Sequence, residues 1–318
     1  MKRIKNRAAY FFINLRFFLR NIFLNNKFLK INSKVKEFEK HGIIKIGVPG
    51  ISEYLLSMIG KTEYINQNKS DLDIKIINQN EHGIKGMSVD ICSDFLWKYV
   101  FTKEIYEILL GYYKGDFYLR NNPVIVFNYD GETHGAQAYH LDWGLRQTSI
   151  MINLTDVIAA STQMTYLLKS NKSYWFKHPN RESDKFKKMV LKYKSNNPNC
   201  SYNTQSNRDT LFIFDAGNGF HRQVPGGQRI MLHLNFVDNL AFTEWDKNWE
   251  PASNSQKEVW FSNSSKKIDE LILKSGLPSK MFSLVLQNHK PGILTPLIFS
   301  KNFEKYTSVE SSLSMHKI

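Results

Sequence analysis

The chain has 318 residues and a formal net charge of +14. Hydrophobic residues make up 42% of it and aromatic residues 14%, which excludes a mainly disordered chain and is enough for a substantial buried core. The two cysteines, Cys92 and Cys200, exclude a disulfide framework and lack the spacing of a zinc site, so a reducing, cytoplasmic location is expected.

The positive charge is concentrated in two segments. Residues 1–36 carry +10, since the first acidic residue is Glu37, and residues 169–194 carry a further +7. The rest of the chain therefore sums to −3. A near-neutral main body argues against binding a polyanion through most of the surface, so no nucleic-acid partner is expected for it.

The N-terminal segment has the pattern of a basic amphipathic helix. Phe11, Leu15, Phe18 and Ile22 form an apolar stripe at helical spacing. The apolar runs are too short to cross a bilayer, and no small-residue cleavage site follows them. Residues 1–30 could lie on an anionic membrane surface as a peripheral contact, or pack on the domain with their lysines in water.

Helical and strand patterns alternate in the next segment. A helix is expected to end at Gly42, followed by a strand over residues 43–48. An amphipathic piece over residues 54–59 precedes a polar stretch, and helical spacing then returns over residues 95–112.

From Phe117 onward the pattern changes to short apolar runs bounded by Gly, Asn, Asp or Pro. Several strands at such spacing predict an antiparallel sandwich or barrel. The expected strands are Phe117–Leu119, Val124–Phe127, Gln147–Leu154, Met164–Leu168, Leu211–Phe214 and Arg229–Phe236.

A Lys-, Asn- and Ser-rich insertion separates two of these strands, over residues 169–207, and contains one short expected helix at Lys185–Lys194. It could be a solvated loop, a lid or a contact surface for an acidic partner. We therefore expect a basic segment over residues 1–36, a single domain over residues 37–305 with this insertion, and a disordered tail over residues 306–318.

One short motif indicates metal chemistry. His140 and Asp142 are two residues apart in extended chain, so both side chains project to the same face. A second histidine, His221, follows another expected strand. Two histidines and one carboxylate on one face leave open coordination positions, the ligand set of non-haem Fe(II) oxygenases.

Such an oxygenase needs a cation for the far carboxylate of its co-substrate, and arginine suits this role. If the turn around Gly226 closes a hairpin, residue 222 opposes residue 230, and Arg229 shares a face with His221. A shift of one residue would turn Arg229 away from the metal, and Arg222 is then the alternative anchor.

These motifs resemble those of the phytanoyl-CoA dioxygenase family of Fe(II)/2-oxoglutarate-dependent oxygenases. The resemblance spans about residues 41–236 and is strongest from Gln137. It rests on the helix end and strand at His41–Val48 and on three further sequence motifs: QAYHLDWG at residues 137–144, MTYLLKSNKS at residues 164–173 and FIFDAGNGFHR at residues 212–222.

The resemblance implies a mainly β fold with flanking helices (α+β), namely a double-stranded β-helix, or cupin-like jelly roll. It also implies Fe(II) held by His140, Asp142 and His221, and 2-oxoglutarate anchored by Arg229. Gln137 and Asn153 are candidates to face the co-substrate, although either could instead pair within the sheet.

The activity implied is a dioxygenase that uses O₂ and converts 2-oxoglutarate to succinate and CO₂ while hydroxylating a small molecule or a carrier-linked substrate. A carboxylate at Asp142 favours hydroxylation or desaturation over halogenation. Two alternatives stay open: a non-catalytic jelly-roll protein that uses its basic N-terminal segment for binding or membrane association, and nucleic-acid binding through the insertion. The histidines outside the motif are expected to be ordinary surface residues: His134, His178, His233 and His289.

Overall fold

The computed structural model describes residues 33–57, 74–79, 85–89, 94–113, 117–119, 123–128, 137–142, 147–172, 184–238, 282–284 and 297–299, together with Leu15 and Leu19. The expectations for the amphipathic stripe of residues 1–30 (apart from these two leucines) and for the tail at residues 306–318 lie outside the described residues, as do His134, His178 and His289. Within the described part of the chain, no helix is long and apolar enough to cross a membrane.

A large antiparallel sheet forms the wall of the domain. Its central strands lie in the order β1 (Ile43–Gly47), β9 (Thr210–Asp215), β6 (Thr148–Asn153) and β11 (Arg229–Asp238). The long strand β11 then pairs with β5 (Val124–Asn128) along its first half and with β4 (Phe117–Leu119) at its end. The sheet continues from β5 through β3 (Lys85–Val89) to β2 (Ile74–Gln79), and from β4 through β13 (Leu297–Phe299) to β12 (Phe282–Leu284).

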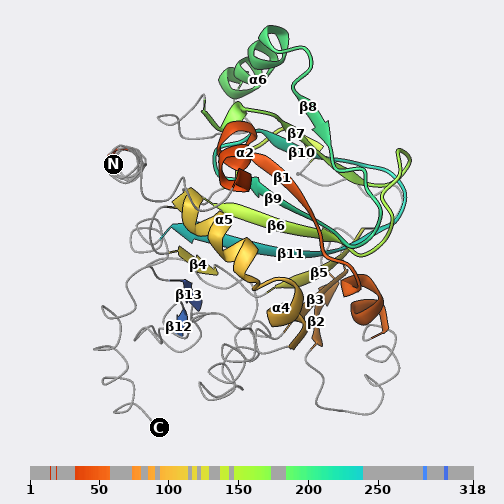
Figure 1. Cartoon of the computed structure of the whole chain (residues 1–318). Coiled ribbons are helices and arrows are strands. Elements are labelled where there is room, and N and C mark those ends of the chain that lie inside the picture. Colours follow the sequence, from red (N-terminus) through yellow and green to blue (C-terminus); the bar gives the residue numbers. More distant parts are fainter. Residues whose placement is uncertain are drawn as a thin grey trace, which may run out of the picture.

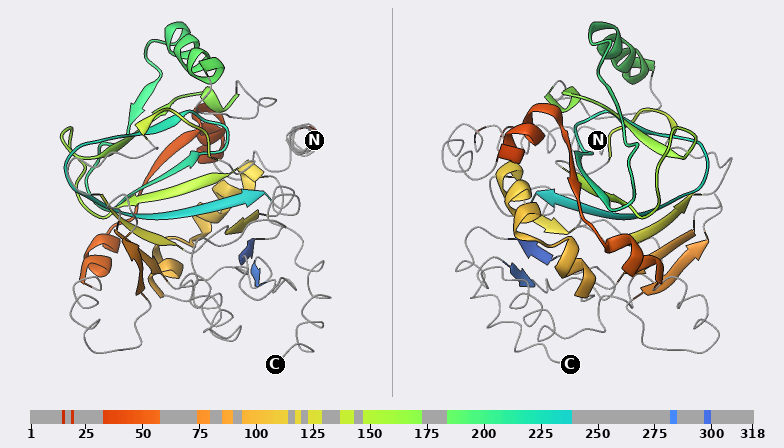
Figure 2. Two further views of the ribbon diagram at one scale, coloured as in Figure 1. Left: turned by 180° about the vertical axis from the view of Figure 1, so that it is seen from behind. Right: turned by 45° about the vertical axis from the view of Figure 1, so that its right-hand side comes forward.

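A smaller sheet faces it, in the order β10 (His221–Val224), β7 (Gln163–Leu167) and β8 (Ser201–Asn203), and the segment at His140 joins this sheet through an antiparallel bridge to His221. From β5 onward the chain alternates between the sheets: large at β5, small at His140, large at β6, small at β7 and β8, large at β9, small at β10, large at β11. This winding is a double-stranded β-helix, and it confirms the expected fold class (Figures 1 and 2).

The expected hairpin between the strands of His221 and Arg229 is wrong. β10 pairs with β7, and β11 pairs with β6 and β5, so the turn between them crosses from one sheet to the other. The crossing is held by the loop after β6, because the Gly227 amide donates to the carbonyl of Ala160 and the Thr162 hydroxyl donates to the carbonyl of Gly226. A Cβ on Gly226 would collide with the backbone of this loop, so glycine is required there.

Helices cover the outer face of the large sheet, as Figure 1 shows for α2 (Ser33–His41) and α5 (Lys103–Tyr113). Their apolar side chains pack on sheet residues that alternate with those facing the barrel interior. This outer core includes Phe38, Ile105, Leu109 and Tyr112 from the helices and Ile150, Ile152, Leu232 and Leu234 from the sheet.

Most expected elements are confirmed within a residue or two. α2 ends at Gly42, whose φ of +77° favours glycine. The helical spacing over residues 95–112 is split into α4 (Asp94–Tyr99) and α5, because the Thr102 hydroxyl caps the new helix by accepting from the Ile105 amide. No helix or strand was expected in the polar stretch before Asn80, but it contains β2, which pairs with β3.

The Lys-rich insertion contains the expected helix, α6 (Asp184–Asn196), and then β8, which pairs with β7. Figure 1 shows α6 projecting beyond the small sheet. Its apolar side packs on the outside of that sheet, while its lysines face outward. The buried side chains on that apolar side are Phe186, Val190 and Tyr193.

Candidate metal centre

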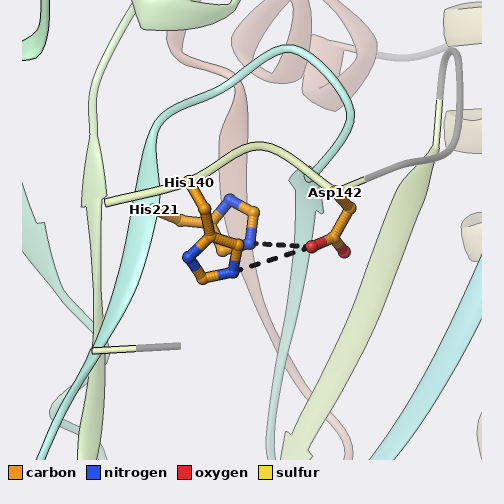
Figure 3. Close-up of side chains that lie close together, drawn as sticks. All are labelled: His140, Asp142 and His221. Carbon is orange, nitrogen blue, oxygen red and sulfur yellow. Dashed lines mark ion pairs between the residues drawn. The ribbon is translucent and has the colours of Figure 1, made fainter. Parts of the chain in front are cut away.

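Three side chains from two neighbouring segments meet inside the barrel (Figure 3). Nε2 of His140 lies 3.7 Å from Oδ1 of Asp142, and Nε2 of His221 lies 3.4 Å from the same oxygen. The ligand atoms of the three residues all lie within 4.8 Å of one another, so they could hold one metal ion. Metal–ligand bonds of about 2.1 Å put adjacent ligand atoms about 3 Å apart, so only a small closure is needed.

Backbone pairing brings these residues together. The His140 amide donates to the carbonyl of His221 at 2.9 Å, and the His221 amide donates to the carbonyl of His140 at 3.2 Å. The Asp142 amide donates to the carbonyl of Ala216 at 2.8 Å. The expectation that His140, Asp142 and His221 share a face is therefore met across the bridge as well as along the chain.

Both histidines are oriented by the same kind of contact. Nδ1 of His140 lies 2.8 Å from the carbonyl oxygen of Ala138, and Nδ1 of His221 lies 3.0 Å from that of Gly219. A carbonyl only accepts, so each Nδ1 carries the proton and donates it. Nε2 is then the ring nitrogen that is directed toward Asp142 and left to bind a metal, as in the tautomer required of a metal ligand.

The turn before His221 is built around the buried carboxylate of Asp215. This side chain is 1% exposed and accepts from the Tyr112 hydroxyl at 2.7 Å and from the Asn218 amide at 3.0 Å. The Tyr166 ring packs beneath Gly219, where a Cβ would collide with it. These contacts fix the carbonyl that holds His221.

The electrostatics of the site stabilise Asp142 as a carboxylate. Burial raises the pKa of Asp142, but the hydrogen bond and charge of His221, with the charges of His140 and His233, outweigh it and lower the pKa to about 2. Burial lowers the pKa of His221, yet Asp142 outweighs that too, and the pKa of His221 is raised above its ordinary value. The pair therefore attracts a cation, whether a proton or a metal.

Arg229 lies on the inner wall formed by β11. Its side chain is 2% exposed, with Nη2 3.3 Å from Oδ1 of Asn128 and Nη1 3.7 Å from Sδ of Met151. Both partners are neutral, and among the described residues Arg229 has no carboxylate partner; its Nε has no hydrogen-bond partner there. Burial lowers the pKa of Arg229 to about 10, so the guanidinium remains charged at neutral pH.

Met151 contacts Arg229, and Met231 shares the inner face of β11 with it. Both methionines belong to the cluster between the sheets that includes Phe214, whose ring lies 5.3 Å from that of His221. Arg222, the alternative anchor, lies elsewhere, since its guanidinium is stacked 4.9 Å from the ring of Tyr139. Arg222 and Tyr139 are each adjacent in sequence to a candidate ligand, so along extended chain they face the other side of the small sheet.

Gln137 and Asn153, the two expected co-substrate contacts, differ in their surroundings. Gln137 is half-buried in a turn directly before the ligand segment. Asn153 is fully buried, and its Nδ2 donates to Oγ of Ser206 at 2.9 Å and to the carbonyl of Thr204 at 3.3 Å. It thus joins β6 to the segment between β8 and β9, while its Oδ1 is buried without a partner in the described structure.

Three residues near the site were missed by the sequence analysis. Gln147 donates to Oδ2 of Asp142 at 2.7 Å and to Oδ1 of Asn235 at 3.1 Å. His233 was expected to be a surface residue, but it is half-buried: burial lowers its pKa to about 4, and the charges of Asp142, Arg229 and His221 also act on it. The signal that could have found them is the two-residue alternation along the expected strand 229–236, which puts His233 and Asn235 on the same face as Arg229.

The helix α6 supports the ligand segments from behind. Phe186 packs edge-to-face on Phe220, with ring centroids 5.5 Å apart, and the same cluster includes Leu141. Leu141 lies between two ligands and Phe220 precedes the third, so this part of the insertion is more than a solvated loop. The aromatic residues Tyr174–Phe176 lie outside the described residues.

No protein-family model matches the chain, and no curated protein matches it. Among solved structures it is similar to EctD from S. alaskensis, solved with 2-oxoglutarate and 5-hydroxyectoine, at 11% identity over 66% of this chain and 77% of that one, with a TM-score of 0.49. It is also similar to SnoK, a non-heme alpha ketoglutarate dependent carbocyclase from nogalamycin biosynthesis (12% identity, 66% and 85% covered, TM-score 0.43). A third is HygX from Streptomyces hygroscopicus, solved with nickel and 2-oxoglutarate (9% identity, 66% and 88% covered, TM-score 0.42). Because these identities and TM-scores are low, the fold is assigned from the strand order described above and not from these similarities.

Proposed function

We propose that this chain is an Fe(II)- and 2-oxoglutarate-dependent dioxygenase. The observation that carries the proposal is a buried guanidinium, Arg229, on an inner wall shared with a His140–Asp142–His221 metal triad. A buried cation whose described partners are neutral is poised for an anion. A metal held by the neighbouring triad would be a second anchor for an anion. A dicarboxylate could therefore bind Arg229 with one end and the metal with the other.

The donor set fits Fe(II). Two neutral imidazole nitrogens and one carboxylate oxygen form the facial triad of non-haem iron oxygenases, and they leave three positions of an octahedral ion for other ligands. Iron, when bound, supplies the chemistry that couples oxidative decarboxylation of 2-oxoglutarate by O₂, giving succinate and CO₂, to oxidation of a second substrate. The carbonyls of Ala138 and Gly219 hold the imidazoles in the required tautomer.

Arg229 would bind the far carboxylate of 2-oxoglutarate. Its planar fork can meet a carboxylate with two hydrogen bonds, and Asn128 orients that fork from the neighbouring strand. We assign Gln137 and Asn153 to the surroundings of the co-substrate, with Asn153 forming part of the wall, because its amide already bonds the segment between β8 and β9.

The finer assignment follows from the sequence motifs. These motifs resemble those of the phytanoyl-CoA dioxygenase-like family. Asp142 fills the carboxylate position, which favours hydroxylation or desaturation over halogenation, and of these two we propose hydroxylation of a small molecule or carrier-linked substrate. The enzyme would be cytoplasmic, with residues 1–30 making a peripheral membrane contact. Its catalytic domain would span residues 37–305.

The test is anaerobic binding of 2-oxoglutarate to the full chain loaded with Fe(II), followed by the visible charge-transfer absorption of the ternary complex. Arg229→Gln should keep the iron and weaken 2-oxoglutarate binding by about 30-fold or more, the equivalent of about 2 kcal/mol for an unpaired buried charge. His140→Ala should abolish iron binding itself.

Arg222→Gln is the matched control, since this arginine stacks on Tyr139 outside the barrel. It should bind 2-oxoglutarate as the unaltered chain does. A chain that binds no iron, or that binds 2-oxoglutarate equally well with Arg229→Gln, would refute the proposal. Slow release of succinate in air, dependent on iron and lost in His140→Ala, would show that the site is catalytic.

A further inference from the structure

A relay of three hydrogen-bonded side chains, Gln147, Asn235 and Ser149, holds Oδ2 of Asp142, which we call its outer oxygen. Nε2 of Gln147 donates to Oδ2 of Asp142 at 2.7 Å and to Oδ1 of Asn235 at 3.1 Å, while the Ser149 hydroxyl donates to the same Asn235 oxygen at 2.6 Å. Gln147 is 2% exposed and Ser149 is fully buried. An amide group in this setting is ordered by its partners rather than by solvent.

The relay gives the two oxygens of Asp142 different surroundings. Oδ1 faces Nε2 of both His140 and His221, whereas Oδ2 faces the amide of Gln147. One proton of the Gln147 amide serves Asp142, and the other serves Asn235. The hydrogen bond occupies one lone pair of Oδ2, so Oδ1 is the oxygen better placed to bind a metal.

We propose that Gln147, supported by Asn235, is a positioning residue that makes Asp142 a one-oxygen metal ligand. A carboxylate free to rotate could bind through both oxygens and occupy an additional coordination position. The relay prevents this and keeps three positions of an octahedral metal open, which is the number that a bidentate 2-oxoglutarate and O₂ need together. This inference rests on the proposed function, because it requires a metal at the triad.

The relay is part of the large sheet and is independent of the histidine supports. Asn235 lies opposite Ser149 in the pairing of β11 with β6, and Gln147 directly precedes β6. The imidazoles are oriented by backbone carbonyls at Ala138 and Gly219 instead. A change at Gln147 should therefore affect Asp142 and leave the histidine tautomers intact.

The experiment measures Co(II) alone, added to the metal-free full chain, with affinity and visible absorption spectrum as the two readouts. Gln147→Leu should weaken Co(II) binding about 10–100-fold, the usual effect of losing such a support. It should also change the spectrum, because Asp142 then binds through both oxygens or not at all. Unfolding midpoints of each variant establish that the chain is folded.

Gln163→Leu is the matched control, since Gln163 is also a buried glutamine, at 6% exposed, but bonds the carbonyl of Ala159 away from the triad. It should keep the affinity and the spectrum. Asn235 provides a second pair of variants: it acts as an acceptor, so Asn235→Leu should reproduce the defect, and Asn235→Asp should retain at least the original affinity.

The outcomes separate this inference from the proposed function. If Gln147→Leu and Asn235→Leu bind Co(II) with unchanged affinity and spectrum, the relay has no positioning role and the inference is wrong, while the metal site stands. If the unaltered chain binds no Co(II), both fail. If it binds Co(II) but Arg229→Gln leaves 2-oxoglutarate binding unchanged, only the proposed function fails.

Discussion

The ring of Tyr166 lies directly beneath Gly219, and a Cβ on this glycine would collide with the Tyr166 ring and hydroxyl. Tyr166 comes from β7 of the small sheet, and its hydroxyl donates to the carbonyl of Asp215 at 3.4 Å. The contact fixes the turn whose carbonyl holds Nδ1 of His221. A packing contact in the barrel interior thus sets the orientation of His221, a candidate metal ligand.

Gly219→Ala should therefore reduce both stability and metal affinity. The added methyl group forces either the turn or the Tyr166 ring to move, at a cost of about 1–3 kcal/mol in the free energy of unfolding. Urea denaturation and Co(II) titration measure the two effects. Gly47→Ala is the control, because nothing lies within 4 Å of a Cβ there, and it should leave both unchanged. Equal behaviour of the two variants would contradict this account.

Metal affinity should rise with pH through the neutral range. Because the pKa of His221 is raised, mainly by Asp142, a proton occupies the site at pH values where a free histidine is already neutral. A metal must displace that proton, so affinity falls as pH decreases and binding releases protons. Co(II) titrations from about pH 8 to about pH 6, in buffers of different ionisation enthalpy, measure both. Affinity independent of pH would show that His221 is already neutral.

His233 should make the metal-free protein less stable in acid. Its pKa is about 4 in the folded chain and 6.5 ordinarily, so the unfolded chain binds more protons between these values. Stability should therefore rise with pH over this window, with a slope of up to about 1.4 kcal/mol per pH unit for one proton. His233→Gln should flatten the slope in urea denaturation curves. Asp142 does not interfere, because its own window lies between about 2 and 3.8.

Asp215→Ala should destabilise the chain by about 1.5–3 kcal/mol, the cost of losing buried hydrogen bonds to a charged acceptor. The change leaves the Tyr112 hydroxyl and the Asn218 side chain without their acceptor. Asp156→Ala is the comparison, since Asp156 is exposed and accepts a hydrogen bond from the backbone amide of Arg208. Thermal or urea unfolding should show a clearly smaller loss for Asp156→Ala, and similar losses would exclude a special role for the buried carboxylate.

One substitution on the buried side of α6 and one on its exposed side test whether this helix supports the candidate ligands. Phe186→Ala removes a buried ring that packs on Phe220 and should cost about 3 kcal/mol of stability, with weaker Co(II) binding. Leu191→Ala, on the same helix but 66% exposed, should change stability by less than about 0.5 kcal/mol. If Phe186→Ala binds Co(II) normally, α6 contributes to folding alone.

Local patterns were sufficient for much of the fold. Short apolar runs bounded by Gly, Asn, Asp or Pro predicted β5, β6, β7, β9 and β11, because turn residues at both ends limit each run to the length of a strand. The two-residue alternation of extended chain placed His140 and Asp142 on one face. Such local patterns could not exclude a hairpin between the strands of His221 and Arg229, since a turn with Pro225 and Gly226 is compatible with either a hairpin or a crossing between sheets.

The sequence by itself thus determined the identity and local spacing of the candidate ligands His140, Asp142 and His221, and the presence of an arginine nearby. Only the tertiary structure decided which sheet each strand joins, that Arg229 rather than Arg222 is buried inside the barrel, and that Gln147 and Asn235 hold Asp142. The physical reason is that burial and side-chain hydrogen bonds between distant segments depend on strand pairing across the whole chain, and periodicity within one segment does not specify that pairing.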